Sequence, residues 1–206
     1  LIQLPDKFFR DYFKSQKISL PLLGDYAVGM VFLPNDLTRS SIAQKAVEQA
    51  ISDEGQIFIG WRDVPTDDTV LGKSVINNKP IIKQFFIQRS SKCKDENHFQ
   101  RKLYVIRKTV HKKIHQSNLL EWEDFYIVSL STRTIVFKGM VLAPNLSKFY
   151  VDFQDTKFET AIALFHQRFS TNTFPSWRLA QPFRYLCHNG EINTCLLYTS
   201  DAADEN

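Results

Sequence analysis

An uninterrupted apolar run, Tyr26 to Leu33 (YAVGMVFL), constrains the fold of this chain more than any other segment. A run of this length that stops at a proline, here Pro34, is typical of a β-strand buried on both faces. Such a strand needs other elements packed above and below it. The fold must therefore contain a sheet covered by further layers.

The rest of the chain alternates helix and strand patterns. We expect a short helix opened by Pro5 and ended by Pro21, and a second helix capped by Thr38 or Ser40 and closed by Gly55. Their apolar faces are Phe8, Phe9, Tyr12 and Phe13 in the first and Ile42, Ala46, Val47 and Ala50 in the second. Further strands are expected at 56–61, 81–87, 125–130, 133–138, 160–169 and 182–188, and Ser131 and Thr132 would join two of them as a hairpin. Together these patterns predict an α+β architecture in which sheets are layered with helices.

The spacing also predicts a long helix over 97–117. One face is apolar and carries Leu103, Ile106, Val110 and Ile114. The other faces carry bases with no acid between them, namely Arg101, Lys102, Arg107, Lys108, Lys112 and Lys113. This run is either an anion- or nucleic-acid-binding surface or the solvated side of a core-packed helix, and the sparse aromatic content favours the solvated side. His111 and His115 lie one turn apart without an acid or a third ligand beside them, so we expect no metal site there.

Composition excludes several classes of protein. The 206 residues fit one large domain or two small ones, and no stretch approaches the roughly 20 apolar residues of a membrane span. The start of the chain shows no pattern of a signal peptide. The three cysteines are too widely spaced for a disulfide framework or a zinc site and are expected to be reduced thiols. Residues 195–206 contain three acids and no Lys or Arg, and without those acids the formal charge rises from +4 to +7.

Polar side chains concentrate between Phe165 and Thr194, in the string FHQRFSTNTFPSWRLAQPFRYLCHNGEINT. A core strand does not need so many hydrogen-bonding groups, whereas a loop that binds a small polar ligand does. Arg168 could hold a carboxylate with its guanidinium, with Thr171 adding a hydroxyl, or it could form an ordinary ion pair. Asn189 and Gly190 could be a tight turn, which the residues alone favour, or an oxyanion hole.

Cys187 and Cys93 have neighbours that could activate a thiol nucleophile. Cys187 and His188 are adjacent on an expected strand and so would point to opposite faces, which excludes a shared proton. Cys93 lies between Lys92 and Lys94, which would favour its thiolate, but no base or oxyanion donor is nearby in sequence. We therefore expect neither residue to be catalytic.

The string HQRFSTNTFPSW followed by AQPFRYLCHNGEINT resembles the class II glutamine amidotransferase domain found at the start of glutamate synthases. Upstream segments resemble the same domain, among them GDYAVGMVFLP, GWRDVPTDDTVLG, RKLYVIRK, FYIVSLSTRTIVFKGM and LSKFYVDFQDTKFETAIALFHQRFSTN. The resemblance covers residues 1–194. It implies a four-layer αββα N-terminal-nucleophile hydrolase sandwich.

The resemblance also implies a chemistry. An N-terminal cysteine, with its own α-amine as base, would attack the side-chain amide of L-glutamine. By motif match, Arg168 and Thr171 would hold the glutamine carboxylate, and Asn189 and Gly190 would form the oxyanion hole. Ammonia would pass to downstream synthase domains that convert 2-oxoglutarate to glutamate with FMN and an iron–sulfur cluster, while this stretch itself would hold no cofactor, metal, nucleic acid or membrane. A cytoplasmic or plastid location fits the resemblance, and the electron donor is not specified by it.

The sequence departs from the family pattern at both ends. Residue 1 is Leu, and no cysteine stands in a CGVGF-like opening, so we expect the chain to begin inside the domain and to lack glutaminase activity by itself. After Thr194 the sequence CLLYTSDAADEN resembles translated sequencing-adapter read-through, so residues 195–206 are expected to be a non-native tail. Three other functions remain open: a non-catalytic glutamine- or glutamate-binding module, another class II amidotransferase such as an asparagine synthetase, and a nucleic-acid-binding protein that uses the helix over 97–117.

Overall fold

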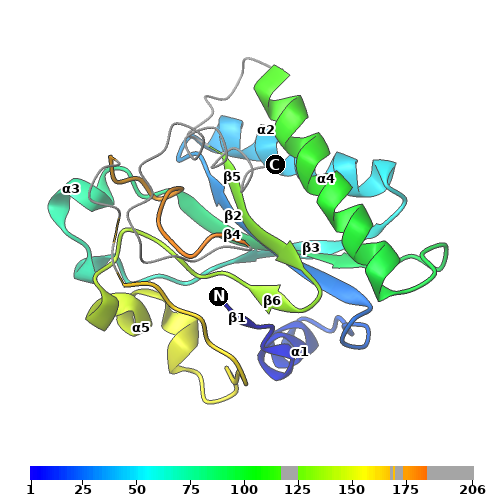
Figure 1. The fold of residues 1–206 in the computed structure, drawn as a ribbon, viewed down its shortest axis with the longest axis horizontal. Helices are drawn as coiled ribbons and strands as arrows, with labels where there is room; N and C mark the ends of the chain where they lie inside the picture. The colour runs from blue at the N-terminus through cyan, green and yellow to red at the C-terminus, as the bar shows by residue number, and fades with distance from the viewer. Residues whose placement is uncertain (117–124, 168, 170–173, 185–206) are drawn as a thin grey trace, which may run out of the picture.

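The computed structural model describes residues 1–116, 125–167, 169 and 174–184. Its main sheet is antiparallel, with the strand order β3–β4–β2–β5 (Figure 1). These strands are β2 (Tyr26–Leu33), β3 (Ile57–Asp63), β4 (Ile81–Gln88) and β5 (Tyr126–Ser131). All eight residues of β2 are buried, which confirms the prediction of an interior strand. Mixed helices and antiparallel strands also confirm the α+β class.

Two helices cover one face of the sheet, α2 (Leu37–Asp53) and α4 (Glu96–Gln116) (Figure 1). Ala27, Val31 and Leu33 of β2 point toward them. The predicted apolar face of α4 is confirmed, because Leu103, Ile106, Val110 and Ile114 are all buried. On α2 the buried set is Ser40, Ala43, Val47, Ala50 and Ile51, so the expected stripe is right at Val47 and Ala50 and displaced elsewhere.

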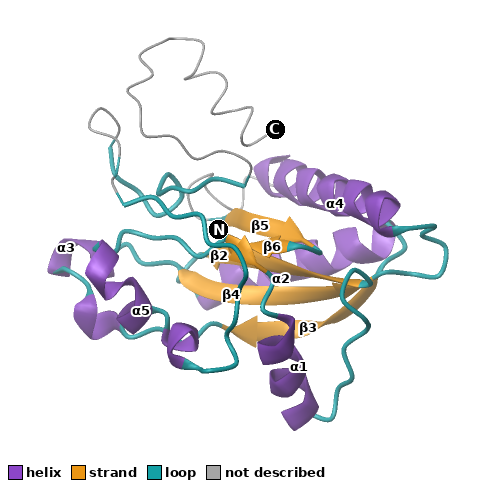
Figure 2. Ribbon diagram, turned by 60° about the horizontal axis from the view of Figure 1, so that its bottom comes forward, coloured by secondary structure: helices purple, strands orange, loops and turns teal. Residues whose placement is uncertain are grey.

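The opposite face of the sheet carries α1 (Asp6–Ser15), the small sheet formed by β1 (Ile2–Gln3) and β6 (Thr134–Ile135), and α5 (Leu146–Phe149) (Figure 2). Alternate residues of β2, namely Tyr26, Val28, Met30 and Phe32, point into this second core. The remaining short elements are α3 (Lys73–Ile76) and three 3-10 turns at Asp68–Val70, Ala143–Asn145 and Val151–Gln154.

Two helix boundaries differ from expectation. Asp36, rather than Thr38 or Ser40, caps α2, because its carboxylate accepts a hydrogen bond from the amide of Arg39 at 2.8 Å. Helix α1 ends at Ser15, well before Pro21. Lys17 adopts a left-handed conformation (φ 61°), and the amide of Ile18 donates to the carbonyl of Phe13 at 2.9 Å, so local hydrogen bonds end the helix first.

The expected hairpin between 125–130 and 133–138 is wrong. Strand β6 pairs with β1, with Ile135 opposite Ile2, whereas β5 pairs with β2. Serine hydroxyls explain the difference: Ser129 accepts from the amide of Val136 at 3.1 Å, and Ser131 accepts from the amide of Arg133 at 3.0 Å. These amides are therefore taken by side chains rather than by a hairpin ladder.

The expected strands at 160–169 and 182–188 are also wrong within the described residues. Residues 160–167 form only an isolated bridge between Ala163 and Ile2, and 182–184 are irregular. Residues 185–188 lie outside the described part of the chain.

The basic faces of α4 behave mainly as a solvated, ion-paired surface. Lys102 pairs with Glu54 at 2.8 Å and Lys113 pairs with Asp53 at 2.7 Å, which ties α4 to the end of α2. Arg107 differs from the expectation of an outward face, because it is 3% exposed. No described helix has the length and apolar character needed to cross a bilayer.

Candidate functional site

The four residues predicted to contact glutamine, Arg168, Thr171, Asn189 and Gly190, lie outside the described residues. The same holds for Cys187, His188 and residues 195–206. The structure instead describes the segment that connects the two predicted motifs, residues 174–184. The contacts that attach residues 174–184 to the rest of the fold are therefore the part of the site region that can be described.

Trp177 fixes the start of this connecting segment in the core. It is 5% exposed, and its indole contacts the rings of Phe32 at 6.1 Å and Phe149 at 5.8 Å between centroids. Phe32 belongs to β2 and Phe149 to α5, so the indole bridges the central strand and the layer that covers it. By contrast, Phe174 is 92% exposed, so burial begins abruptly at Trp177.

Lys138 holds the next residue of the segment. Its ammonium donates to the carbonyl of Arg178 at 2.6 Å and lies 4.6 Å from the ring centroid of Tyr126. The backbone at Lys138 is itself fixed, because the hydroxyl of Tyr150 donates to the Lys138 carbonyl at 2.7 Å. Burial raises the pKa of Tyr150, so its phenol stays protonated and remains a donor.

Arg184 fixes the end of the connecting segment. It is 7% exposed, and its Nη1 donates to the carbonyl of Ile127 on β5 at 2.6 Å. Its guanidinium also lies 5.1 Å from the ring centroid of Tyr126. Asn189 follows five residues later in the sequence.

His111 of α4 lies beside this attachment. Its ring centroid is 5.7 Å from that of Phe125 and 6.5 Å from that of Tyr126. Burial, and then the positive charges of Arg184 and Arg107, lower the pKa of His111 to about 3. The imidazole is therefore neutral at physiological pH. Within the described ranges no three or more His, Cys, Asp and Glu side chains gather as a metal site would require.

Cys93 does not have the environment of a nucleophile. It is 4% exposed, and burial raises the pKa of its thiol above the usual value. The thiolate is therefore disfavoured, which corrects the effect expected from Lys92 and Lys94. The prediction that Cys93 is not catalytic agrees with this environment.

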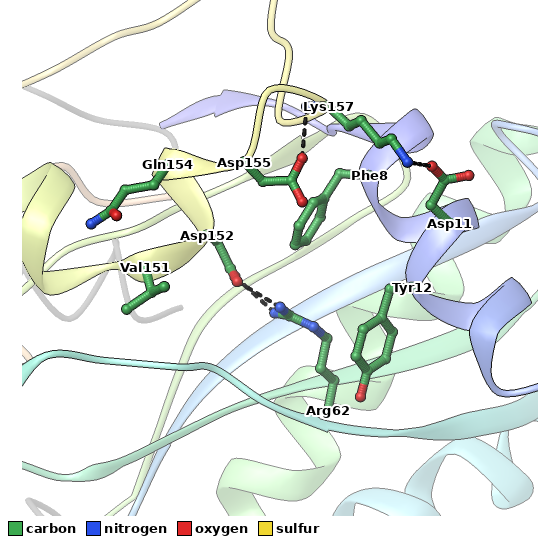
Figure 3. A pocket seen from close by; sticks show the side chains of 9 residues that line it. All are labelled: Phe8, Asp11, Tyr12, Arg62, Val151, Asp152, Gln154, Asp155 and Lys157. Carbon is green, nitrogen blue, oxygen red and sulfur yellow. Dashed lines mark hydrogen bonds and ion pairs between the residues drawn. The ribbon is translucent and has the colours of Figure 1, made fainter.

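Sequence reasoning missed a buried ion pair, Arg62 with Asp152. Two hydrogen bonds join the guanidinium and the carboxylate, at 2.6 and 2.8 Å, and Arg62 also donates to Gln84 at 2.9 Å. The rings of Phe8 and Tyr12 lie 5.0 and 4.7 Å from the guanidinium carbon (Figure 3). The available signal was weak, because Arg62 directly follows the expected strand over 56–61 instead of lying inside it. A charged side chain must be paired if it is buried, but the sequence did not show that Arg62 would be buried.

A surface cavity of about 530 Å³ opens over this ion pair (Figure 3). It is lined by Phe8, Asp11, Tyr12, Arg62, Val151, Asp152, Gln154, Asp155 and Lys157. The Arg62 guanidinium and the Asp152 carboxylate at its base bind each other, and Lys157 binds Asp11 at its rim. These charged groups are thus used within the fold, and the residues predicted for glutamine are not among the described residues.

Comparison with known proteins identifies the family. The family described as "Glutamine amidotransferases class-II" matches residues 1–198. The chain is 45% identical over 194 residues to the glutamate synthase [NADPH] large chain of Bacillus subtilis (strain 168) and 39% identical over 193 residues to ferredoxin-dependent glutamate synthase 2 of Synechocystis sp.. It is 38% identical over 192 residues to the chloroplastic/mitochondrial ferredoxin-dependent glutamate synthase 1 of Arabidopsis thaliana.

These matches cover 94%, 94% and 93% of this chain, respectively. They cover 12% of the length of each relative. The resemblance based on the string between Phe165 and Thr194 is therefore confirmed over nearly the whole chain. The chain belongs to the class II glutamine amidotransferase family.

Proposed function

We propose that this chain is part of the glutaminase domain of a glutamate synthase. The observation that carries the proposal is the match to glutamate synthases over 94% of the chain, together with the family match over residues 1–198, which include both polar motifs. In the parent enzyme the domain would hydrolyse L-glutamine and deliver ammonia to 2-oxoglutarate in downstream domains. We also propose that the parent enzyme is located in the cytoplasm or in a plastid.

Each motif has a role in the proposed chemistry. The Arg168 guanidinium and the Thr171 hydroxyl bind the substrate carboxylate, since a guanidinium can donate two parallel hydrogen bonds to it. The Asn189 side-chain amide and the Gly190 backbone N–H stabilise the negative charge that develops on the amide oxygen during attack. The nucleophile is a cysteine thiolate supplied at the mature N-terminus of the parent.

FMN and an iron–sulfur cluster belong to the parent rather than to this stretch. An iron–sulfur cluster requires several cysteine ligands, and the described part of the chain has one cysteine, the buried Cys93. The described residues therefore do not fit a cluster.

We propose the four-layer sandwich because of the packing on the face of the sheet that carries α1 and α5. Segment 160–165 runs along β1, where the amide of Gln3 donates to Ile162 at 3.2 Å and the amide of Leu164 donates to Leu1 at 2.8 Å. Ile162, Leu164 and Phe165 are nevertheless 67%, 47% and 79% exposed. A larger second sheet built on this edge would cover them. We place the domain at residues 1–194 and propose that residues 195–206 are not part of it.

Glutamine binding by the 206-residue chain tests the function. Calorimetry should detect L-glutamine and not D-glutamine, and Arg168→Ala should abolish the signal because the carboxylate loses its partner. Asn189→Ala should bind nearly as well as the unmodified chain, because oxyanion donors act mainly in the transition state. Absence of L-glutamine binding, or equal binding by Arg168→Ala, would contradict the proposal.

The same preparation should show no glutamine hydrolysis. The chain as printed has Leu at position 1, so the attacking thiolate would be missing and with it most of the rate enhancement. Ammonia release above that of the Arg168→Ala control would overturn this expectation.

A further inference from the structure

The connecting segment is seated on a position that only glycine can occupy. A Cβ built on Gly139 would lie 2.3 Å from Cζ3 of Trp177 and 2.8 Å from its Cε3. Both distances are shorter than any real contact between carbon atoms, so the indole rests directly on the Gly139 backbone. Both contacted atoms belong to the six-membered part of the indole, the part that a smaller aromatic residue would lack.

Hydrogen bonds attach the residues of the connecting segment that follow Trp177. Lys138, next to Gly139, donates to the carbonyl of Arg178, next to Trp177. Arg184 then closes the segment on the carbonyl of Ile127. The apolar contacts of Trp177 and two charge-assisted hydrogen bonds therefore attach residues 177–184 to the fold, and charge-assisted bonds are the stronger kind.

The two predicted motifs adjoin this attached segment in the sequence. Thr171 precedes Trp177 by six residues, and Asn189 follows Arg184 by five. At a reach of about 3.4 Å per residue, chain segments of six and five residues span at most about 20 Å and about 17 Å. Groups that bind opposite ends of one small substrate must be held within about 0.5 Å of their working positions.

Given the proposed function, we propose that Gly139 and Trp177 are positioning residues that set the two glutamine-binding motifs relative to each other. They act through the connecting segment and do not touch the substrate. The Gly139 contact fixes the depth of the indole, and Lys138 and Arg184 fix the direction of the segment from which the two motifs continue in the sequence.

Three variants of the 206-residue chain test the inference by L-glutamine calorimetry and by amide hydrogen exchange. Gly139→Ala pushes the indole outward and should weaken glutamine binding at least about tenfold. Exchange should increase in 174–184 and stay unchanged in β2 and β4. Trp177→Phe vacates the space without any overlap and should weaken binding in a chain that stays folded. In the double variant the shorter ring leaves room for the methyl group, so binding should return to the level of Trp177→Phe alone.

Gly60→Ala is the matched control, because nothing lies within 4 Å of a Cβ built there. The inference is overturned if Gly139→Ala or Trp177→Phe binds glutamine as tightly as this control does. It is also overturned if the double variant binds no better than Gly139→Ala, since the effect would then not pass through the contact. Failure of the unmodified chain to bind glutamine would overturn the proposed function itself, and the positioning role with it.

Discussion

Gly29 lies at a position in the sheet where there is no room for a side chain. It lies opposite Phe85 on the neighbouring strand, and a Cβ at this position would come within 2.1 to 2.6 Å of three atoms of the Phe85 ring. That ring is fully buried and packs against Trp61 at 5.4 Å between centroids, so it has no free direction in which to move. The close fit makes Gly29 part of the core although it has no side chain.

Gly29→Ala should therefore lower the free energy of unfolding by about 1–3 kcal/mol, the usual cost of overpacking. Urea unfolding of the purified chain measures it. Gly60→Ala, on the adjacent part of the sheet with open space around its Cβ, serves as the control. Equal stability of the two variants would contradict the expected overlap.

The ion pair between Arg62 and Asp152 gives a second prediction for single residues. Asp152→Asn should destabilise the fold by about 3–5 kcal/mol, because it leaves the Arg62 charge buried without a counter-charge. Glu159→Gln, which breaks the exposed pair with Lys7, should change stability by less than about 1 kcal/mol. Chemical denaturation of both variants compares them directly, and a similar small loss in each would refute the structural role of the buried pair.

At the scale of elements, helix α2 depends on its cap. Asp36→Ala should cost about 1 kcal/mol of stability, because the amide of Arg39 loses its acceptor. Asp36→Ser keeps a short side-chain acceptor and should retain most of the stability. Thermal unfolding of the two variants tests the cap, and loss of stability in Thr38→Ala instead would restore the expectation drawn from the sequence.

Helix α4 should make stability depend on pH through His111. In the unfolded chain this histidine takes up a proton near its ordinary pKa of 6.5, whereas in the fold it stays neutral to about pH 3. Between about pH 6.5 and pH 3 the unfolded state therefore binds more protons than the folded state. The free energy of unfolding falls as pH falls through this range, by up to about 1.4 kcal/mol per pH unit. Carboxylates with lowered pKa, such as Glu96 beside Arg133, lose their contribution only at lower pH.

Unfolding measured between pH 7 and pH 5 therefore isolates the histidine. His111→Gln should show a shallower pH dependence than the unmodified chain. His98→Gln, on the first turn of the same helix, reports the effect of losing an imidazole elsewhere. If His111→Gln retains the full slope, the buried neutral imidazole is not its source.

Elements that depend on local periodicity could be predicted, and those that depend on distant partners could not. The patterns of β2 and α4 are contained in their own residues, so both were found within one or two residues of their ends. The pairing of β6 with β1 depends on Ile2, far away in the chain, and on serine hydroxyls that take the hairpin amides. Distances along the sequence contain no such information.

The same distinction applies to the site. The string between Phe165 and Thr194 identified the family, because its polar residues are contiguous. The contact of Trp177 with Gly139 was missed, because Gly139 directly follows the expected strand over 133–138. Only a glycine inside a strand pattern would have signalled close backbone approach. The roles of Arg168, Thr171, Asn189 and Gly190 stay predictions, because these residues lie outside the described structure.

For the molecule as a whole, we predict that the net charge of +4 does not serve nucleic-acid binding. Lys102 and Lys113 of α4 are paired with acids of the α2 end, so they are not available to release counterions from a phosphate backbone. We expect binding to a short DNA duplex to be weaker than about 10⁻⁴ M at physiological salt. Fluorescence anisotropy tests this, and a variant with Asp53→Asn and Glu54→Gln should bind more tightly at low salt because both lysines are released.

The central position of β2 has a consequence for how the chain is made. This strand leaves the ribosome before both of its partners, β4 beginning at Ile81 and β5 beginning at Tyr126. At a synthesis rate of about 5–20 residues per second, the most apolar segment of the nascent chain waits about 5–20 s for its second neighbour. During that interval YAVGMVFL is a strand with an open edge, and it is the segment that a chaperone would have to shield until translation passes Ser131.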